Sequence, residues 1–233
     1  MLNQCIKIQR KFSRTASLNF PSATPSSRRL HCCSSMGQDD VKWTSPRFCI
    51  VSDLDHTMVD HHDVNFSSLL EFNKTWVSKF SHDSLLVFST GRSLVAYMTL
   101  RDEAPLLTPD LLICSVGTEI YHTTESGVLE LDKEWLGKLD KGWNREIIVA
   151  ITSDQFKELQ PQADSEQRPH KISFHLQKEL DRASASACVE RLRNELASAK
   201  QAVKVVHSGG IDVDILPECA SKGLALQFLQ VRI

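Results

Sequence analysis

Apolar runs and amphipathic stretches alternate along the chain from residue 47 onward. Short apolar runs, each closed by polar residues or glycine, predict buried strands at 48–52, 85–88 and 111–116. Amphipathic stretches between them predict helices at 64–80 and at about 93–103, the second of which stops at Pro105. Strands separated by helical segments indicate an α/β fold, with a parallel sheet joined by right-handed crossovers.

The pattern changes in the middle of the chain. Residues 122–165 are polar and show no clear strand alternation. Beyond them the sequence predicts a helix at 180–199 and strands at 171–176, 202–207 and 211–216. We expect the block 122–215 to form a small α+β module inserted into a sheet domain that comprises 47–121 and 216–233.

Composition is that of an ordinary globular protein, with 41% of residues hydrophobic and 24% charged. No stretch approaches the ~20 apolar residues of a membrane-spanning helix, so no such helix is expected. The net charge of −2 gives no reason to expect nucleic acid as a partner. Seven scattered cysteines without a Cys-x-x-Cys pair favour reduced thiols in an intracellular protein.

The first 38 residues differ from the rest of the chain. They contain six basic residues, no acidic residue, many serines and two prolines, a composition that does not fold alone. Because such a composition is typical of a transit peptide, we expect residues 1–46 to be a disordered leader or an import signal. A plain disordered tail, or sequence upstream of a start at Met36, is the alternative.

Two carboxylates, Asp53 and Asp55, follow the first predicted strand. Side chains alternate along a strand, so the two share one side at its carboxyl end, where open α/β sheets bind ligands. One carboxylate there can attack an electrophile while the other moves protons, and a hard cation can hold their charge. The pair is therefore the leading candidate for a catalytic site.

Four features in chain order resemble the haloacid dehalogenase superfamily of phosphohydrolases. The segment 53–57 (Asp-Leu-Asp-His-Thr) fits its DxDxT signature, Thr90 its second motif and Lys222 its third, and the inserted module fits members with a cap at that point. Longer stretches resemble the plant sucrose-phosphate phosphatase family, at 50–63, 83–92 and 166–174. The resemblance implies a Rossmann-like parallel-sheet core with an inserted α+β cap.

The resemblance also implies roles for the motif residues. Asp53 would be the nucleophile that forms an aspartyl-phosphate, and Asp55 the acid that protonates the leaving sugar oxygen. Thr90 would hold the phosphoryl oxygens, and Lys222 would neutralise their developing charge. Mg²⁺ would be bound by Asp53 and by the backbone carbonyl of Asp55, and would cancel the repulsion between nucleophile and substrate.

Substrate contacts are expected from the loop after the second strand and from the cap. The resemblance implies hydrolysis of sucrose 6-phosphate to sucrose and phosphate, so the cap needs polar side chains for sugar hydroxyls. The candidates, each of which could instead belong to a solvated loop or strand face, are Gly91, Arg92, Glu166, Gln167, His170, Lys171 and Asp212. Sucrose-phosphate synthase, which makes the substrate, is the implied protein partner.

Histidines and carboxylates just after the first strand support a second hypothesis. A transition-metal cluster could be formed by His56, Asp60, His61, His62 and Asp63, and the run 60–62 also resembles the DHH phosphoesterases, which bind Mn²⁺. The other acidic motifs of that family are not found in the sequence. A turn-rich flap that shields the site or touches substrate is therefore the favoured interpretation.

One superfamily motif is not found. An acidic run of the type GDSxND normally follows motif three, and the sequence ends 11 residues after Lys222. We therefore expect a core incomplete at its C-terminus, an uncovered edge on the first strand and too few oxygen ligands for Mg²⁺. Two hypotheses stay open: an active Mg²⁺-dependent sucrose-phosphate phosphatase, or a catalytically weak member that binds sugar phosphate or a partner. The family implies a cytoplasmic location, and the leader, as an import signal, would imply a plastid or mitochondrion.

Overall fold

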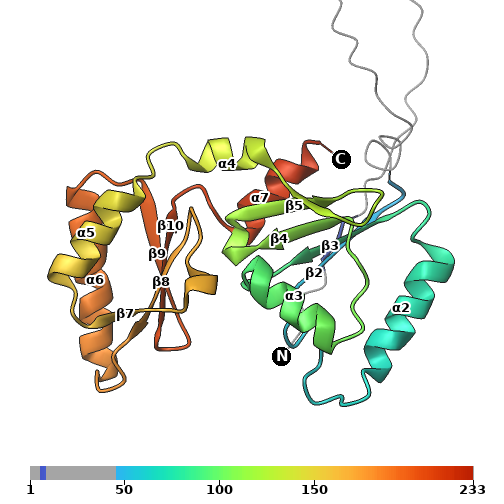
Figure 1. Cartoon of the computed structure of the whole chain (residues 1–233), viewed down its shortest axis with the longest axis horizontal. Helices are drawn as coiled ribbons and strands as arrows, with labels where there is room; N and C mark the ends of the chain where they lie inside the picture. The colour runs from blue at the N-terminus through green and yellow to red at the C-terminus, as the bar shows by residue number, and fades with distance from the viewer. Residues whose placement is uncertain (1–5, 9–45, 233) are drawn as a thin grey trace, which may run out of the picture.

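The computed structural model describes residues 6–8 and 46–232, which form two bodies side by side (Figure 1). The larger body is built on a six-stranded sheet with strand order β1-β2-β3-β4-β5-β6. The smaller body is built on a four-stranded sheet with order β7-β8-β10-β9. The prediction of an α/β protein with a separate α+β module is therefore confirmed.

Parallel pairing is confined to the middle of the larger sheet. The parallel strands are β2 (Cys49–Ser52), β3 (Leu85–Ser89) and β4 (Leu111–Cys114). Beyond β4 the sheet continues in antiparallel fashion with β5 (Glu119–Thr123) and β6 (Leu129–Leu131). Every residue of β3 and β4 is buried, as expected for strands covered on both faces.

Helices cover both faces of this sheet, so the larger body has three layers. The covering helices are α2 (Ser67–Lys79), α3 (Leu94–Glu103), α4 (Lys133–Leu139) and α7 (Lys222–Gln230). Phe88 of β3 packs in one apolar cluster with Tyr97 of α3, and its neighbour Val87 packs in another with Leu229 of α7. Alternate side chains of one strand thus enter opposite layers.

Strand β1 (Ile6–Ile8) lies antiparallel to β2, with Ile6 opposite Val51. We expected the leader to be without structure and the edge of the first strand to be uncovered. Strand β1 contradicts both expectations, because these three leader residues pair with that edge. An edge strand presents unpaired backbone N–H and C=O groups, and an extended segment of the same chain satisfies them here. Residues 1–5 and 9–45 of the expected leader lie outside the described residues.

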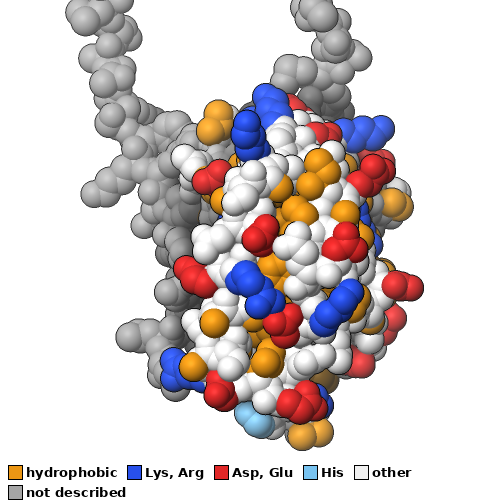
Figure 2. Space-filling view, turned by 90° about the vertical axis from the view of Figure 1, so that its left-hand side faces the viewer, with side chains coloured by type: hydrophobic (Ala, Val, Ile, Leu, Met, Phe, Trp, Pro, Cys, Tyr) orange, Lys and Arg blue, Asp and Glu red, His pale blue; other side chains and the backbone are white. Residues whose placement is uncertain are grey.

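The smaller body is an antiparallel sheet backed by two helices. Its strands are β7 (Leu159–Pro161), β8 (Ile172–Leu176), β9 (Val203–Ser208) and β10 (Asp212–Pro217). Helices α5 (Arg145–Gln155) and α6 (Arg182–Ser198) lie on the side that faces away from the larger body (Figure 1). The outer face of these helices carries acidic and basic side chains in mixture (Figure 2), so it presents no field of one sign.

The boundary of the module lies later than expected. Strand β6 pairs with β5 in the larger sheet, and Trp135 of α4 belongs to an apolar cluster of the larger body. Residues up to 139, predicted to belong to a module at 122–215, therefore lie with the larger body. Strand β6 is short and partly exposed, which is why no apolar run marks it. None of the helices that the structure describes combines the length and apolar character of a membrane span.

Candidate active site

A lysine and an aspartate that are far apart in the sequence lie in contact at the carboxyl end of β2. Nζ of Lys222 lies 2.7 Å from Oδ2 of Asp53. The other carboxylate oxygen of Asp53 accepts a hydrogen bond of 2.8 Å from the backbone N–H of Leu54, which is fully buried. One oxygen of Asp53 is thus fixed by the backbone, and the other faces a cation.

A close backbone contact places Lys222. Ser221 caps α7 by accepting a hydrogen bond from the N–H of Leu224, so Lys222 is the first residue of the helix. Gly117 lies against this cap with a φ of +94°, and a Cβ at Gly117 would be 2.2 Å from the carbonyl carbon of Ser221. Ser115 and Val116 also have positive φ, so three consecutive residues adopt the left-handed region. This turn requires glycine at its last position.

Thr90 follows β3, the parallel neighbour of β2, and is fully buried. Its backbone N–H donates to the carbonyl of Ile113, and its hydroxyl accepts a hydrogen bond of 3.1 Å from the N–H of Arg92. The structure therefore places Asp53 and Thr90 at the same end of adjacent parallel strands. Gly91, the next residue, is exposed, with open space where a side chain would stand.

Asp55 is held by two cationic or polar partners. Nε and Nη2 of Arg92 donate to its two oxygens at 2.9 and 2.7 Å, and Nε2 of His61 lies 2.8 Å from Oδ1. The hydrogen bonds from Arg92, and then from His61, lower the pKa of Asp55 to about 2 against the opposing effect of burial. Arg92, which we predicted to bind substrate, is bonded to the acid–base candidate in this arrangement. Asp55 is correspondingly an anion.

The histidine-rich segment forms a compact flap and no metal cluster. The N–H groups of Met58 and Val59 both donate to the carbonyl of Leu54, and the ring of His56 packs edge-on against that of His61 at 5.2 Å. Within the described part of the chain, no group of three or more histidine, cysteine or acidic side chains is arranged to hold a metal ion. The cluster hypothesis therefore has no support among the described residues, the segment is rich in turns as expected, and its role in shielding the site or touching substrate stays a prediction.

The described residues do not by themselves form a complete Mg²⁺ site. The predicted ligands were Asp53 and the backbone carbonyl of Asp55, and the carboxylate of Asp55 adds no further ligand because Arg92 and His61 occupy both its oxygens. What remains is one oxygen of Asp53 that faces Lys222, together with the backbone carbonyl of Asp55. Mg²⁺ requires about six oxygens in near-octahedral geometry, so these groups account for only part of its coordination.

The cap reaches this site through a loop that contains Glu166. Oε1 of Glu166 accepts a hydrogen bond of 2.9 Å from the hydroxyl of Ser93, the residue that caps α3 directly after Arg92. Oε2 of Glu166 pairs at 2.9 Å with Nζ of Lys171, which is buried. Two predicted substrate residues, Glu166 and Lys171, therefore lie at the boundary between module and core.

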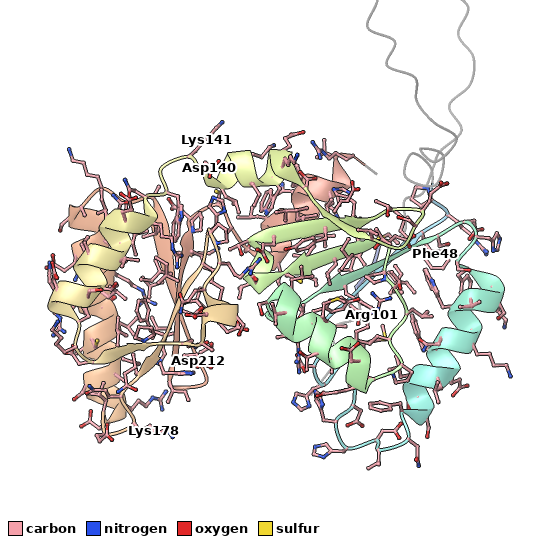
Figure 3. The ribbon with its side chains drawn as sticks, viewed as in Figure 1. Phe48, Arg101, Asp140, Lys141, Lys178 and Asp212 are labelled. Carbon is pink, nitrogen blue, oxygen red and sulfur yellow. The ribbon has the colours of Figure 1, made fainter. Side chains whose placement is uncertain are left out.

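The other three predicted substrate residues have different surroundings. Gln167 donates to the carbonyl of Ser173 and so binds the module's own sheet. His170 is buried, and its Nε2 lies 2.8 Å from the carboxylate of Asp140 in the segment that links α4 to α5. Figure 3 shows Asp140 at the linker and Asp212 near the opposite end of the small sheet, where Asp212 pairs with His175 at 2.9 Å. His170 thus faces the linker, and Asp212 binds within the module.

Sequence reasoning missed three residues that shape this region. Ser93 joins the cap to the loop after β3, Gly117 seats the helix of Lys222, and Glu119 pairs with Arg168 of the module at 2.7 Å. Glu119 had a readable signal, since it is a lone charge just before the apolar pair Ile120 and Tyr121. Because buried charges need a partner, this position would have indicated an ion pair without saying which one.

These features define a class of protein. A three-layer α/β core with an inserted cap, and an aspartate after the first parallel strand that pairs with a lysine after the cap, are those of a haloacid dehalogenase-like phosphohydrolase. The chain belongs to the sucrose-6F-phosphate phosphohydrolase family, whose model matches residues 46–233.

Known proteins support this assignment. A probable sucrose-phosphatase 2 of Arabidopsis thaliana is 49% identical over 184 residues, which are 79% of this chain and 42% of that protein. Sucrose-phosphatase 1 of Nicotiana tabacum is 48% identical over 190 residues, 82% of this chain and 43% of that protein. The solved sucrose-phosphatase of Synechocystis sp. PCC6803, in complex with sucrose and phosphate, is 35% identical with a TM-score of 0.63, and the match covers 78% of this chain and 68% of that one.

The chain spans less than half the length of the plant relatives it matches, 42% and 43%.

Proposed function

We propose that the chain is a phosphoric monoester hydrolase that acts on sucrose 6-phosphate, releasing sucrose and phosphate. The observation that carries the proposal is the ion pair of Asp53 and Lys222 at 2.7 Å, beside Thr90 at the end of the adjacent strand. A nucleophilic carboxylate, a cation for the phosphoryl oxygens and a hydroxyl are the groups that phosphoryl transfer requires. The relatives named for sucrose phosphate supply the substrate class.

The first chemical step is attack by Asp53, whose two carboxylate oxygens have different partners. The oxygen that faces Lys222 attacks phosphorus, the bond to the sugar oxygen breaks, and an aspartyl-phosphate forms. Lys222 then lies against the phosphoryl oxygens, where its charge stabilises the negative charge that develops in the transition state. The backbone bond from Leu54 to the other oxygen holds the carboxylate in place.

Proton transfer depends on Asp55. As an anion bonded to Arg92, Asp55 can accept a proton from the water that hydrolyses the aspartyl-phosphate. Donation of a proton to the leaving sugar oxygen requires that Asp55 first leave Arg92 and become protonated. Mg²⁺, the cofactor proposed from the family, would be held by Asp53 and the carbonyl of Asp55 and would offset the repulsion between carboxylate and phosphate.

Phosphate release from sucrose 6-phosphate by the purified chain tests the proposal, with and without Mg²⁺. We expect Mg²⁺-dependent turnover that disappears in Asp53→Asn, because that amide cannot form the covalent intermediate. Asp102→Asn, at an exposed carboxylate of α3, is the matched control and should keep wild-type turnover. Turnover that survives in Asp53→Asn would contradict the assignment of the nucleophile.

A second candidate function rests on the side chains that are bonded to Asp55. Both its oxygens are held by Arg92 and His61, and the described residues supply few oxygens to Mg²⁺, so the chain could bind sugar phosphate with little turnover. Titration calorimetry with sucrose 6-phosphate separates the two functions. Binding without phosphate release favours the second, whereas robust turnover rejects it.

A further inference from the structure

A buried carboxylate on the core sheet forms an ion pair with the cap. Glu119, on β5, is 2% exposed. Its Oε1 accepts a hydrogen bond of 2.8 Å from Nε of Arg168 and lies 2.7 Å from Nη2 of the same side chain. Its other oxygen accepts a hydrogen bond of 3.2 Å from the hydroxyl of Ser115. For stability alone an apolar side chain would be expected at this buried position, because burying a charge costs free energy unless the charge is paired. The pairing with Arg168 explains why a carboxylate is present.

Arg168 is itself part of a loop that is fixed on several sides. The backbone groups of Arg168 and Lys171 bond to each other at 3.0 and 3.1 Å, which closes a tight turn. Nη1 of Arg145, at the start of α5, donates to both of their carbonyls, at 2.7 and 3.0 Å. The indole N–H of Trp143, in the linker, donates to the carbonyl of Pro169. The turn is therefore bonded to the linker and to the start of α5.

The same loop carries Glu166, two residues before Arg168. Glu166 reaches Ser93, which directly follows the loop of Thr90, Gly91 and Arg92 at the proposed phosphate site. Glu119 and Ser93 are thus two core contacts of one cap segment, 166–171. The contact at Glu119 is buried, whereas the side chain of Glu166 is 23% exposed and remains accessible to a ligand.

We propose that Glu119 is a positioning residue of the phosphatase: by holding Arg168, it fixes the loop 166–171 so that Glu166 stands over the phosphate site. The proposal rests on the proposed function. Glu119 acts through Arg168 and touches no reacting atom. It sets where the polar groups of the cap meet the sugar part of the substrate, while the phosphate end is held by core residues alone.

Glu119→Gln tests this, since it keeps the size of the side chain and removes its charge. We expect the KM for sucrose 6-phosphate to rise about tenfold with little change in kcat, and the inhibition constant of inorganic phosphate to stay the same. Glu158→Gln is the matched control: Glu158 pairs with Arg191 at 2.7 Å entirely within the module. It should leave both constants unchanged.

Arg168→Gln and the double variant show whether Glu119 acts through Arg168. Because the two residues form one unit, the double variant should cost no more than Arg168→Gln alone. Additive effects, or a phosphate inhibition constant that shifts with KM, would overturn the proposal. Arg168 is partly exposed, so Arg168→Gln keeps the test open if Glu119→Gln does not fold.

Hydrogen exchange of the backbone amides at 166–171 gives a readout that needs no activity. We expect faster exchange in Glu119→Gln and Arg168→Gln, and wild-type exchange in Glu158→Gln. Unchanged exchange in the first two variants would overturn the positioning role. If the wild-type chain releases no phosphate from sucrose 6-phosphate, the proposed function fails, and the exchange rates then decide the positioning role alone.

Discussion

Lys222 donates to Asp53 across 169 residues of chain, with Nζ 2.7 Å from Oδ2. The aspartate ends a strand of the core, and the lysine begins a helix that follows the whole inserted module. Their contact therefore requires both that the core sheet has formed and that α7 has packed on it.

Lys222→Met should lower the turnover of sucrose 6-phosphate by about 10²- to 10³-fold, the usual effect of losing one preorganised group that stabilises transition-state charge. The methionine keeps the length of the side chain and removes its charge. Steady-state phosphate release measures the change. Lys178→Met, in an exposed turn of the module, should have no effect. A comparable loss in both variants would contradict a specific role for Lys222.

Gly117→Ala should displace α7, because the new Cβ would stand 2.2 Å from the backbone of Ser221. We expect a loss of about 3 kcal/mol or more in the free energy of unfolding, together with the loss of phosphate release. Urea denaturation measures the first quantity. Gly127→Ala is the control, since Gly127 also has positive φ but has open space around it. It should cost only about 1 kcal/mol from backbone strain.

Acid should weaken the pair of Asp55 and Arg92 at a predictable pH. The hydrogen bond from Arg92 lowers the pKa of Asp55 from 3.8 to about 2, so the pair stabilises the fold above pH 3.8. That contribution is lost as the pH falls through about 2. Arg92→Gln raises the pKa in the folded state, so its stability deficit relative to wild type should shrink below pH 3.8.

Urea unfolding of both proteins at pH values from neutral down to acid measures that deficit. Arg101→Gln is the control, because Arg101 donates to the hydroxyl of Thr108, which does not titrate. Its deficit should not depend on pH in this range. A deficit for Arg92→Gln that is constant with pH would show that Asp55 is not the partner.

Ser93→Ala should have two effects, because Ser93 both caps α3 and donates to Glu166. We expect a loss of about 1 kcal/mol in stability from the lost cap, and a rise in the KM for sucrose 6-phosphate as Glu166 is released. Asn144→Ala removes the cap of α5, where Asn144 accepts from the N–H of Ile147. It should cost similar stability and leave KM unchanged. Equal effects on KM would refute the role of the Ser93 contact.

Hydrophobic pattern predicted the central strands of this fold and failed at its margins. Strands β3 and β4 are buried along their whole length, so a run such as Leu85 to Phe88 marks them clearly. Strands β6 and β7 have three residues each and are partly exposed, so their side chains show neither a run nor a clear alternation. Strand β1 could not be predicted, because pairing at a sheet edge uses backbone groups that every residue carries.

Some contacts of the candidate site could likewise be predicted from the sequence, and others could not. The resemblance to the haloacid dehalogenase superfamily implied that Lys222 and Asp53 belong to one site, and the structure places them 2.7 Å apart. The sequence could not predict that Arg92 binds Asp55 or that Glu119 binds Arg168. These pairs depend on which of several charged side chains reaches a given carboxylate, and that follows from the path of loops. His170 is a further example: its partner Asp140 lies in the linker, and its role in substrate binding stays a prediction.

Helix α7 covers apolar side chains of the core sheet, including Val87 and Ile113, yet it is made only after the entire module. On a ribosome that adds about 5–20 residues per second, this face of the sheet would be covered only by α4 for several seconds while the module is synthesised. The module can bury its own apolar cluster during that interval, whereas the core cannot. The nascent core therefore exposes apolar surface on this face until Lys222 and the helix behind it emerge.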